Sequence, residues 1–284
     1  MNKQTISLII LLILMSGCAS LTSPRQSDYI TVNGLKMYYE IRGQGQPLVL
    51  LHGGGSSIET SFGNIIDSLA KDYQVIAIEQ QAHGHTPDMD RDLSFEQMAD
   101  DTANLLKQLK IKKANFLGFS NGGNIALQVA IRHREMVRKM ILASAFTRND
   151  GLYPSVRESI SKGSSPADMP SELRDEYLDI APNPNDLGKL VRKQVALMSN
   201  FQDIPDETIR AVLAHTMIII GDKDIVLPEH AIEMHRMISH SQLVILPGVH
   251  GAYIGEATSK NANKELPKYT VGLMKEFLNS PLPK

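Results

Sequence analysis

The sequence has almost no cysteine. Cys18 is the only one among 284 residues, so the chain cannot close an intramolecular disulfide. If Cys18 is acylated, no thiol remains in the folded domain for cysteine catalysis or for a thiolate metal site. The zinc-hydrolase pattern H-E-x-x-H does not occur either. The sequence therefore predicts no metal and no other cofactor.

An excess of charge of one sign is also missing. The 29 lysines and arginines nearly balance the 31 aspartates and glutamates, and the net charge is −2. Nucleic-acid-binding domains gather their basic residues in a patch or stripe, so no nucleic-acid partner is predicted. Heptad runs and internal repeats do not occur, which excludes coiled coils and solenoids.

Long hydrophobic runs are lacking apart from one near the start. Residues 6–15 are almost entirely apolar, but about ten residues is roughly half the length that a helix needs to cross a bilayer. Lys3 precedes this run, and Ser16, Gly17 and Cys18 follow it. A positive charge, a short apolar run and small residues are typical of a secretory signal peptide.

The cysteine after Ser-Gly makes this segment resemble a bacterial lipoprotein signal, in which the cysteine is lipidated and becomes the mature N-terminus. The resemblance implies an exported protein that is lipid-anchored to the cell envelope through Cys18 and has no other membrane contact. Ala19 favours the outer over the inner membrane, by similarity to bacterial sorting. A plain signal peptide is the alternative. Residues 1–17 are predicted to be the signal peptide, 18–28 a linker and 29–284 the folded domain.

What the rest of the sequence does have is a regular alternation of strand-like and helix-like stretches. Short apolar runs indicate strands buried on both faces, and Asn33-Gly34 indicates a hairpin turn. The clearest amphipathic helix starts after Ser94, with Gln97 completing a predicted capping box. The predicted strands are 29–32, 35–41, 47–51, 75–78, 115–117, 140–143, 217–220 and 243–246. The other predicted helices are 60–71, 121–133, 229–237 and 264–278. The alternation predicts an α/β fold with a mainly parallel sheet flanked by helices.

The alternation breaks in residues 147–214. This stretch is polar, is rich in proline and serine, and has no strand-like run. Helices are predicted at 171–180, 186–199 and 206–213. An insertion of this kind is predicted to form a helical lid above the strand ends, where it would close a substrate pocket.

Gly118-Phe119-Ser120-Asn121-Gly122 carries the first chemical signal. It matches G-x-S-x-G, in which a serine sits on a tight strand-to-helix turn. An apolar run precedes it and a predicted helix follows, as the motif requires. Ser120 is therefore the predicted nucleophile, and a buried structural serine is the alternative.

A glycine-rich segment follows the predicted strand 47–51. Attack on an ester carbonyl develops negative charge on its oxygen, and backbone N–H groups must already point there. The segment His52-Gly53-Gly54-Gly55 can bring backbone close to such an oxygen. The amides of Gly54 and Asn121 are the predicted oxyanion-hole donors, and His52 is predicted to hold the loop. A merely flexible glycine turn is the alternative.

An acid and a base are predicted on the loops after the last two strands. Asp224 follows strand 217–220 and His250 follows strand 243–246, so both lie at the sheet edge that carries Ser120. The imidazole would take the serine proton, and the carboxylate would fix its tautomer. Asp222 is the rival acid, but it lies closer to the strand and is predicted to cap the turn.

The other histidines are less suited to be the base. His230, His235 and His240 fall on or near one predicted helix face, where solvent would surround them. His83 and His85 lie in a loop that could border the pocket.

These motifs, in this order, resemble the α/β-hydrolase superfamily, specifically its lid-bearing, esterase-like branch. The resemblance covers about residues 29–278 and implies an eight-stranded, mostly parallel sheet. It also implies acyl transfer in two steps through an acyl-enzyme on Ser120. Glu79 and Ala82 stand where the family usually has Asp and Gly, His85 where Arg or Gly is common, and His215 where Pro is usual. None of these departures touches the predicted triad.

The expected function is a serine hydrolase that cleaves carboxylic esters with small or medium acyl groups, with a small-molecule substrate as its partner. A lactonase, a thioesterase or a carbon–carbon bond hydrolase would use the same triad and remains open. A ligand-binding protein that kept the fold but lost turnover is the alternative of another class. Such proteins usually lose a triad member, and none is missing here.

Overall fold

The computed structural model describes residues 25–259 and 265–282. The predicted signal peptide and Cys18 lie outside these residues, and nothing in the structure bears on them. The first strand begins at Gln26, so the folded part includes the last residues of the stretch predicted to be a linker. None of the helices in the described ranges has the length and apolar character needed to span a membrane.

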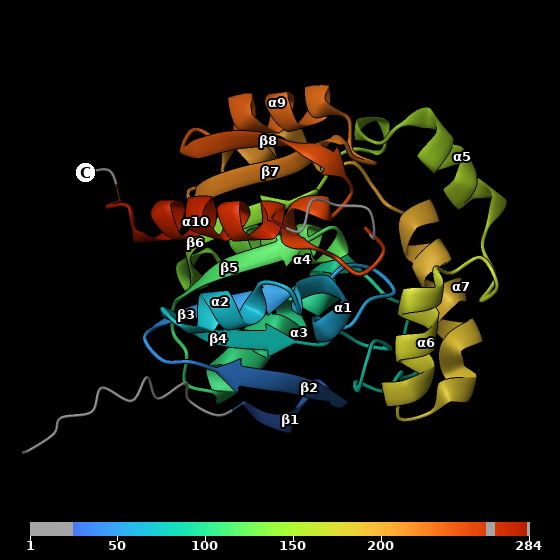
Figure 1. Cartoon of the computed structure of the whole chain (residues 1–284). Helices are drawn as coiled ribbons and strands as arrows, with labels where there is room; N and C mark the ends of the chain where they lie inside the picture. The colour runs from blue at the N-terminus through green and yellow to red at the C-terminus, as the bar shows by residue number, and fades with distance from the viewer. Residues whose placement is uncertain (1–24, 260–264, 283–284) are drawn as a thin grey trace, which may run out of the picture.

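The described residues form an eight-stranded sheet in the order β1-β2-β4-β3-β5-β6-β7-β8 (Figure 1). The strands are β1 Gln26–Val32, β2 Leu35–Arg42, β3 Gln46–Leu51, β4 Tyr73–Ile78, β5 Ala114–Phe119, β6 Val137–Ala143, β7 His215–Lys223 and β8 Ser241–Val249. β2 is antiparallel to both of its neighbours, and all other pairs are parallel. Asn33 and Gly34 both have positive φ, as a tight hairpin turn requires. The predicted α/β class and mostly parallel sheet are confirmed.

Helices cover both faces because the central strands bury both of theirs. Alternate residues of β3 pack into two separate clusters, Val49 and Leu51 on one side and Leu48 and Leu50 on the other. One cluster is closed by α3 Phe95–Gln108, α4 Asn121–Arg132 and α9 Pro228–Met237. The other is closed by α1 Ile58–Phe62, α2 Ile66–Ala70 and α10 Leu266–Asn279. Each fully buried aliphatic side chain contributes roughly 1.5–3 kcal/mol, so this double core fixes the sheet firmly.

Two local predictions were wrong in detail. The predicted helix 60–71 is two short helices, because α1 ends at Gly63 and α2 starts only at Ile66. Both present a buried apolar side to the sheet, so their pattern resembles that of one helix. At α3, Ser94 caps the Gln97 amide as predicted. The Gln97 side chain does not complete the box, since it donates to Asp101 instead.

Residues 147–214 contain the helices α5 Pro154–Lys162, α6 Ser171–Ile180, α7 Leu187–Ser199 and α8 Asp206–Arg210. In Figure 1, α5, α6 and α7 lie beside the ends toward which the arrows of the parallel strands point. The sequence did not predict α5, and the reason is visible in its packing. None of its residues is fully buried, and only Val156 and Ile160 pack against the core, so its apolar stripe is too short to be recognised as a helix.

Candidate active site

Ser120 occupies a strained turn between β5 and α4. Its φ of 53° and ψ of −121° are unusual for a residue with a side chain. The two flanking glycines allow this turn because a Cβ at Gly118 would lie 2.0 Å from the Gly122 oxygen. A Cβ at Gly122 would lie 1.9 Å from the Leu51 oxygen on β3. Backbone packing therefore requires both glycines and holds the serine at the strand end.

Asp224 and His250 form a close pair on the loops after β7 and β8. His250 Nδ1 lies 2.6 Å from Asp224 Oδ1. The other carboxylate oxygen accepts from the Ser144 hydroxyl at 2.6 Å and the Gly221 amide at 3.1 Å. The amide of Ile225 also donates to Oδ1, at 2.7 Å. A side chain bonded on both oxygens has one orientation, and here that orientation faces the imidazole.

The charge state of Asp224 sets the tautomer of His250. Burial raises the pKa of Asp224, but the facing imidazole and the hydrogen bonds from His250, Ser144 and the Gly221 amide outweigh burial and bring it below its usual 3.8. An ionised carboxylate has no proton to give, so Nδ1 of His250 is the donor in this bond. Nε2 is then left as the acceptor, which a general base requires.

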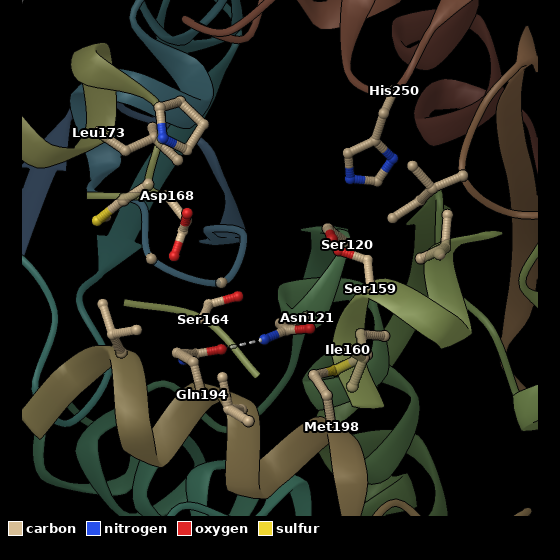
Figure 2. Close-up of a pocket in the computed structure, with 18 of the residues that line it drawn as sticks. Ser120, Asn121, Ser159, Ile160, Ser164, Asp168, Leu173, Gln194, Met198 and His250 are labelled. Carbon is tan, nitrogen blue, oxygen red and sulfur yellow. Dashed lines mark hydrogen bonds between the residues drawn. The ribbon is translucent and has the colours of Figure 1, made fainter. Parts of the chain in front are cut away.

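Ser120 and His250 line the same cavity. Figure 2 shows the imidazole of His250 directed toward the Ser120 side chain. The ring of Phe119, next to the serine in sequence, lies 4.8 Å from the imidazole, centroid to centroid. The structure thus brings together the three predicted catalytic residues at the carboxyl ends of β5, β7 and β8.

Asp222, the rival acid, has a different task. Its side chain is exposed and accepts a hydrogen bond from the Gly248 amide at 2.7 Å. This bond ties the end of β7 to the end of β8. Asp222 therefore acts as a turn cap, whereas Asp224 faces the base.

Of the three glycine amides in the loop after β3, two donate hydrogen bonds to residues that the structure describes and one does not. Gly53 N–H donates to the Ser61 hydroxyl at 3.2 Å, and Gly55 N–H donates to His83 Nε2 at 3.1 Å. Gly54 N–H and Asn121 N–H have no partner within the described part of the chain, and both residues line the cavity with Ser120. Asn121 is the first residue of α4, where helix geometry leaves the amide free. The two predicted oxyanion-hole donors are thus the available ones.

A polar network from the lid meets this loop. Gln194 on α7 accepts from Asn121 Nδ2 at 2.9 Å and donates to His83 Nε2 at 2.8 Å (Figure 2 draws the first bond). His83 is held from behind, since its Nδ1 donates to the Gln81 carbonyl. Burial lowers the pKa of His83 to about 4, so at neutral pH its Nε2 is unprotonated, and the Gly55 amide and Gln194 share its one lone pair. The side chain of Gln194 therefore connects the lid both to Asn121, whose amide is an oxyanion donor, and to His83, which holds the Gly55 amide.

His52 holds the loop, as predicted. Its Nδ1 lies 2.8 Å from the Gly53 carbonyl, and its Nε2 accepts from the Gln80 amide at 3.0 Å. Burial and the neighbouring His83 together lower its pKa to about 3, so the ring is neutral and cannot compete as a base.

One expectation about the other histidines was wrong. His230 is buried rather than solvated, and its Nε2 accepts from the Thr147 amide at 3.0 Å at the start of the lid. Gly151 packs against its ring. His85 does not line the cavity either, because it stacks on Tyr38 and bonds Glu79.

The cavity at this site has a volume of about 530 Å³. The loops after β3, β5, β7 and β8 form one side, and α5, α6 and α7 with their connections form the other. Much of its lining is apolar, with side chains such as Val156, Ile160, Leu190 and Met198. A space of this size suits a small organic molecule.

Three supporting residues were missed from the sequence. Ser144 follows β6 directly and bonds both Asp224 and the hydroxyl of Tyr253. Its place after a strand, on the same sheet edge as Ser120, was a usable signal. Tyr253 and Gln194 gave none, because their roles depend on how distant segments pack. Across the described residues, no group of three or more His, Cys, Asp or Glu side chains is placed to hold a metal ion.

Comparison with known proteins agrees with this fold. A family model described as the α/β-hydrolase fold matches residues 46–184. The human serine hydrolase BPHL is 31% identical over 252 residues, which cover 83% of this chain and 84% of that protein. The structure of 2-hydroxy-6-oxo-6-phenylhexa-2,4-dienoate hydrolase from Rhodococcus sp. strain RHA1 has a TM-score of 0.73 at 17% identity, over 90% of this chain and 99% of that one. The enol-lactonase from Burkholderia xenovorans LB400 has a TM-score of 0.68 at 21% identity, over 89% and 100%.

Proposed function

Because the chain belongs to the α/β-hydrolase family, we propose that it is a serine hydrolase that cleaves carboxylic esters with small or medium acyl groups. The observation that carries this proposal is the 2.6 Å contact between His250 Nδ1 and Asp224 Oδ1 beside a cavity that Ser120 also lines. A structural ion pair would not need its free imidazole nitrogen to face a strained serine.

The first half of the reaction forms an acyl-enzyme. His250 Nε2 takes the proton of the Ser120 hydroxyl as the oxygen attacks the ester carbonyl. The charge on the carbonyl oxygen is stabilised by the free amides of Gly54 and Asn121. The imidazolium, stabilised by Asp224, then gives its proton to the leaving alcohol as the carbon–oxygen bond breaks.

The second half returns the enzyme to its start. His250 takes a proton from a water molecule, whose oxygen attacks the acyl carbon. The same two amides stabilise the second tetrahedral intermediate. The acid leaves as the serine oxygen recovers the proton from the imidazolium.

Lactones, thioesters and carbon–carbon bonds next to a carbonyl could be cleaved by the same three residues. The relatives include proteins named for an enol lactone and for a dienoate. Esters are proposed first because their cleavage needs only a serine nucleophile, its base and acid, and two oxyanion donors, the groups that meet at this cavity. A panel of p-nitrophenyl esters, lactones and thioesters tests the order of preference.

The experiment for the ester reaction is stopped-flow turnover of p-nitrophenyl butyrate. An acyl-enzyme predicts an initial burst of p-nitrophenol close to one per enzyme when deacylation is slower. Turnover by the wild type that Ser120→Ala lacks supports the proposal. Stoichiometric phosphonate labelling without turnover of any panel member would instead favour the ligand-binding alternative.

We also propose that the enzyme is exported and held at the bacterial envelope by a lipid on Cys18, with the outer membrane favoured. The support is the sequence of residues 1–18 alone. Metabolic labelling with a palmitate analogue in a bacterial host tests it. Label and membrane association should both disappear in Cys18→Ser, and a cleaved but unlabelled wild-type protein would contradict the anchor.

A further inference from the structure

Among residues 25–259 and 265–282, no lysine or arginine lines the cavity, and the only positive charge there is the one that His250 acquires during turnover. The stretch 147–214 contains eight lysines and arginines, yet none of them lines the cavity among the described residues. Serine hydroxyls, one glutamine, one aspartate and apolar side chains form the lid side instead. The lid thus keeps its cations away from the substrate.

The lid cation next to the cavity, Lys193, is held outside it by the loop between β4 and α3. Lys193, next to Gln194, donates to Asp88 Oδ1, Met89 O and Arg91 O, all within 2.8 Å. An ammonium group has three hydrogens, so these bonds use all of them. Lys193 therefore cannot turn toward the cavity without breaking these three hydrogen bonds.

The one lid residue with a charge in the cavity lining is an acid. Figure 2 shows the carboxylate of Asp168 across the open space from His250. The hydroxyl and amide of Ser165 donate to its Oδ2 at 2.7 and 2.8 Å. These bonds lower the pKa of Asp168, which keeps it ionised at neutral pH.

We infer that the site takes substrates whose acyl and alcohol groups are uncharged and selects against those that carry a carboxylate away from the scissile bond. This inference rests on the proposed hydrolase function and narrows its substrate class. A carboxylate moved from water into this cavity would find no cation to pair with, and unpaired burial of charge is costly. The oxyanion amides cannot serve it, because in a productive complex they hold the reacting carbonyl.

The test uses one pair of substrates, the mono-p-nitrophenyl ester of adipic acid and the same compound with its distal acid methylated. The two have the same chain length and leaving group. We expect kcat/KM for the free acid to be about 100-fold lower than for the methyl ester, after subtraction of the rate with Ser120→Ala. A ratio below about threefold would overturn the inference.

Variants show whether charge causes the difference. Asp168→Asn removes the only cavity carboxylate of the lid, and it should raise the acid-to-ester rate ratio about fivefold at low salt. Val195→Lys places a cation in the lining and should raise the ratio about tenfold, whereas Val195→Gln should not. Asp168 is exposed, so its substitution leaves the fold intact. Unchanged ratios in both charge variants would contradict the inference.

The outcomes separate this inference from the function on which it rests. Equal cleavage of both compounds would leave the ester hydrolase standing and remove the selectivity. Cleavage of neither compound, nor of any ester in the panel, would remove the hydrolase and the inference together.

Discussion

The loops at the strand ends and the lid line the same cavity but are held in very different ways. The side chain of Asp224 is 0% exposed, and both of its carboxylate oxygens accept hydrogen bonds. In the lid, α5 has no buried residue, and Ser164, Ser165 and Asp168 are exposed. The comparison teaches that the groups proposed for the chemistry are fixed by the sheet, whereas the groups proposed for selectivity rest on a lightly packed insertion.

The sharpest contrast between the two regions is a pair of serines in the same cavity. Ser120→Ala should lower kcat for p-nitrophenyl butyrate by about 10⁴-fold or more, since removal of a triad member has that effect elsewhere. Ser159→Ala removes a hydroxyl from the lid side and should change kcat less than about threefold. Comparable losses in both would break the contrast.

The two aspartates at the carboxyl end of β7 give a second matched pair. Asp224→Asn leaves the shape of the site but favours the wrong imidazole tautomer, so kcat should fall on the order of 10³- to 10⁴-fold. Asp222→Asn, which affects only the Gly248 cap, should stay within about threefold. A greater loss at Asp222 would reverse the assignment of the acid.

Substitutions in the sheet should lower the free energy of unfolding more than substitutions in the lid. Leu117→Ala on β5 removes a side chain that is 0% exposed, and the free energy of unfolding should fall by about 2–5 kcal/mol. Ile160→Ala on α5 should cost about 1 kcal/mol or less, because that side chain is only partly buried. Urea unfolding measures both, and equal losses would show that the lid is packed as firmly as the core.

The contact between His83 and the lid residue Gln194 should make the stability of the protein depend on pH. His83 has a pKa of about 4 in the folded protein against the ordinary 6.5, so between these values the unfolded chain binds a proton that the folded chain does not. Stability is therefore complete above about pH 6.5 and is lost as pH falls toward 4, by about 2 kcal/mol from pH 7.5 to pH 5 for this residue. The loss should shrink in His83→Gln but persist in His240→Gln, an exposed control. An equal loss in wild type and His83→Gln would rule out this cause.

The smallest expected effect concerns the contact between lid and oxyanion loop. Gln194→Leu removes the bonds to Asn121 and His83, and kcat should fall about tenfold with little change in KM. Gln202→Leu, an exposed lid glutamine, should have no effect. An unchanged kcat in Gln194→Leu would mean that the loop holds its own shape.

The difference between the regions also explains what the sequence could predict. Strands such as β3 and β5 are recognisable because burial on both faces demands continuous apolar runs. Ser120 and the two free amides are recognisable because the turns that hold them need glycine. Backbone constraints of this kind leave a local trace in the sequence.

The rest of the site leaves no such trace. Gln194, Tyr253 and the buried His230 owe their roles to contacts with distant residues. The separations run from 73 positions for Gln194 and Asn121 to 111 positions for Gln194 and His83. α5 could not be predicted because none of its residues is fully buried and only Val156 and Ile160 pack against the core. The position of Asp168 in the cavity, and the absence of lid cations from its lining, follow only from how the lid helices are placed on the sheet.

The most direct test of the account is the site of covalent modification by a fluorophosphonate, read by mass spectrometry of the digested protein. We expect one adduct per chain, on the peptide that contains Ser120, and strongly slowed labelling in His250→Gln. Ester turnover that persists without an adduct at Ser120, or an adduct on a different serine, would contradict the proposal that the sheet loops activate this hydroxyl.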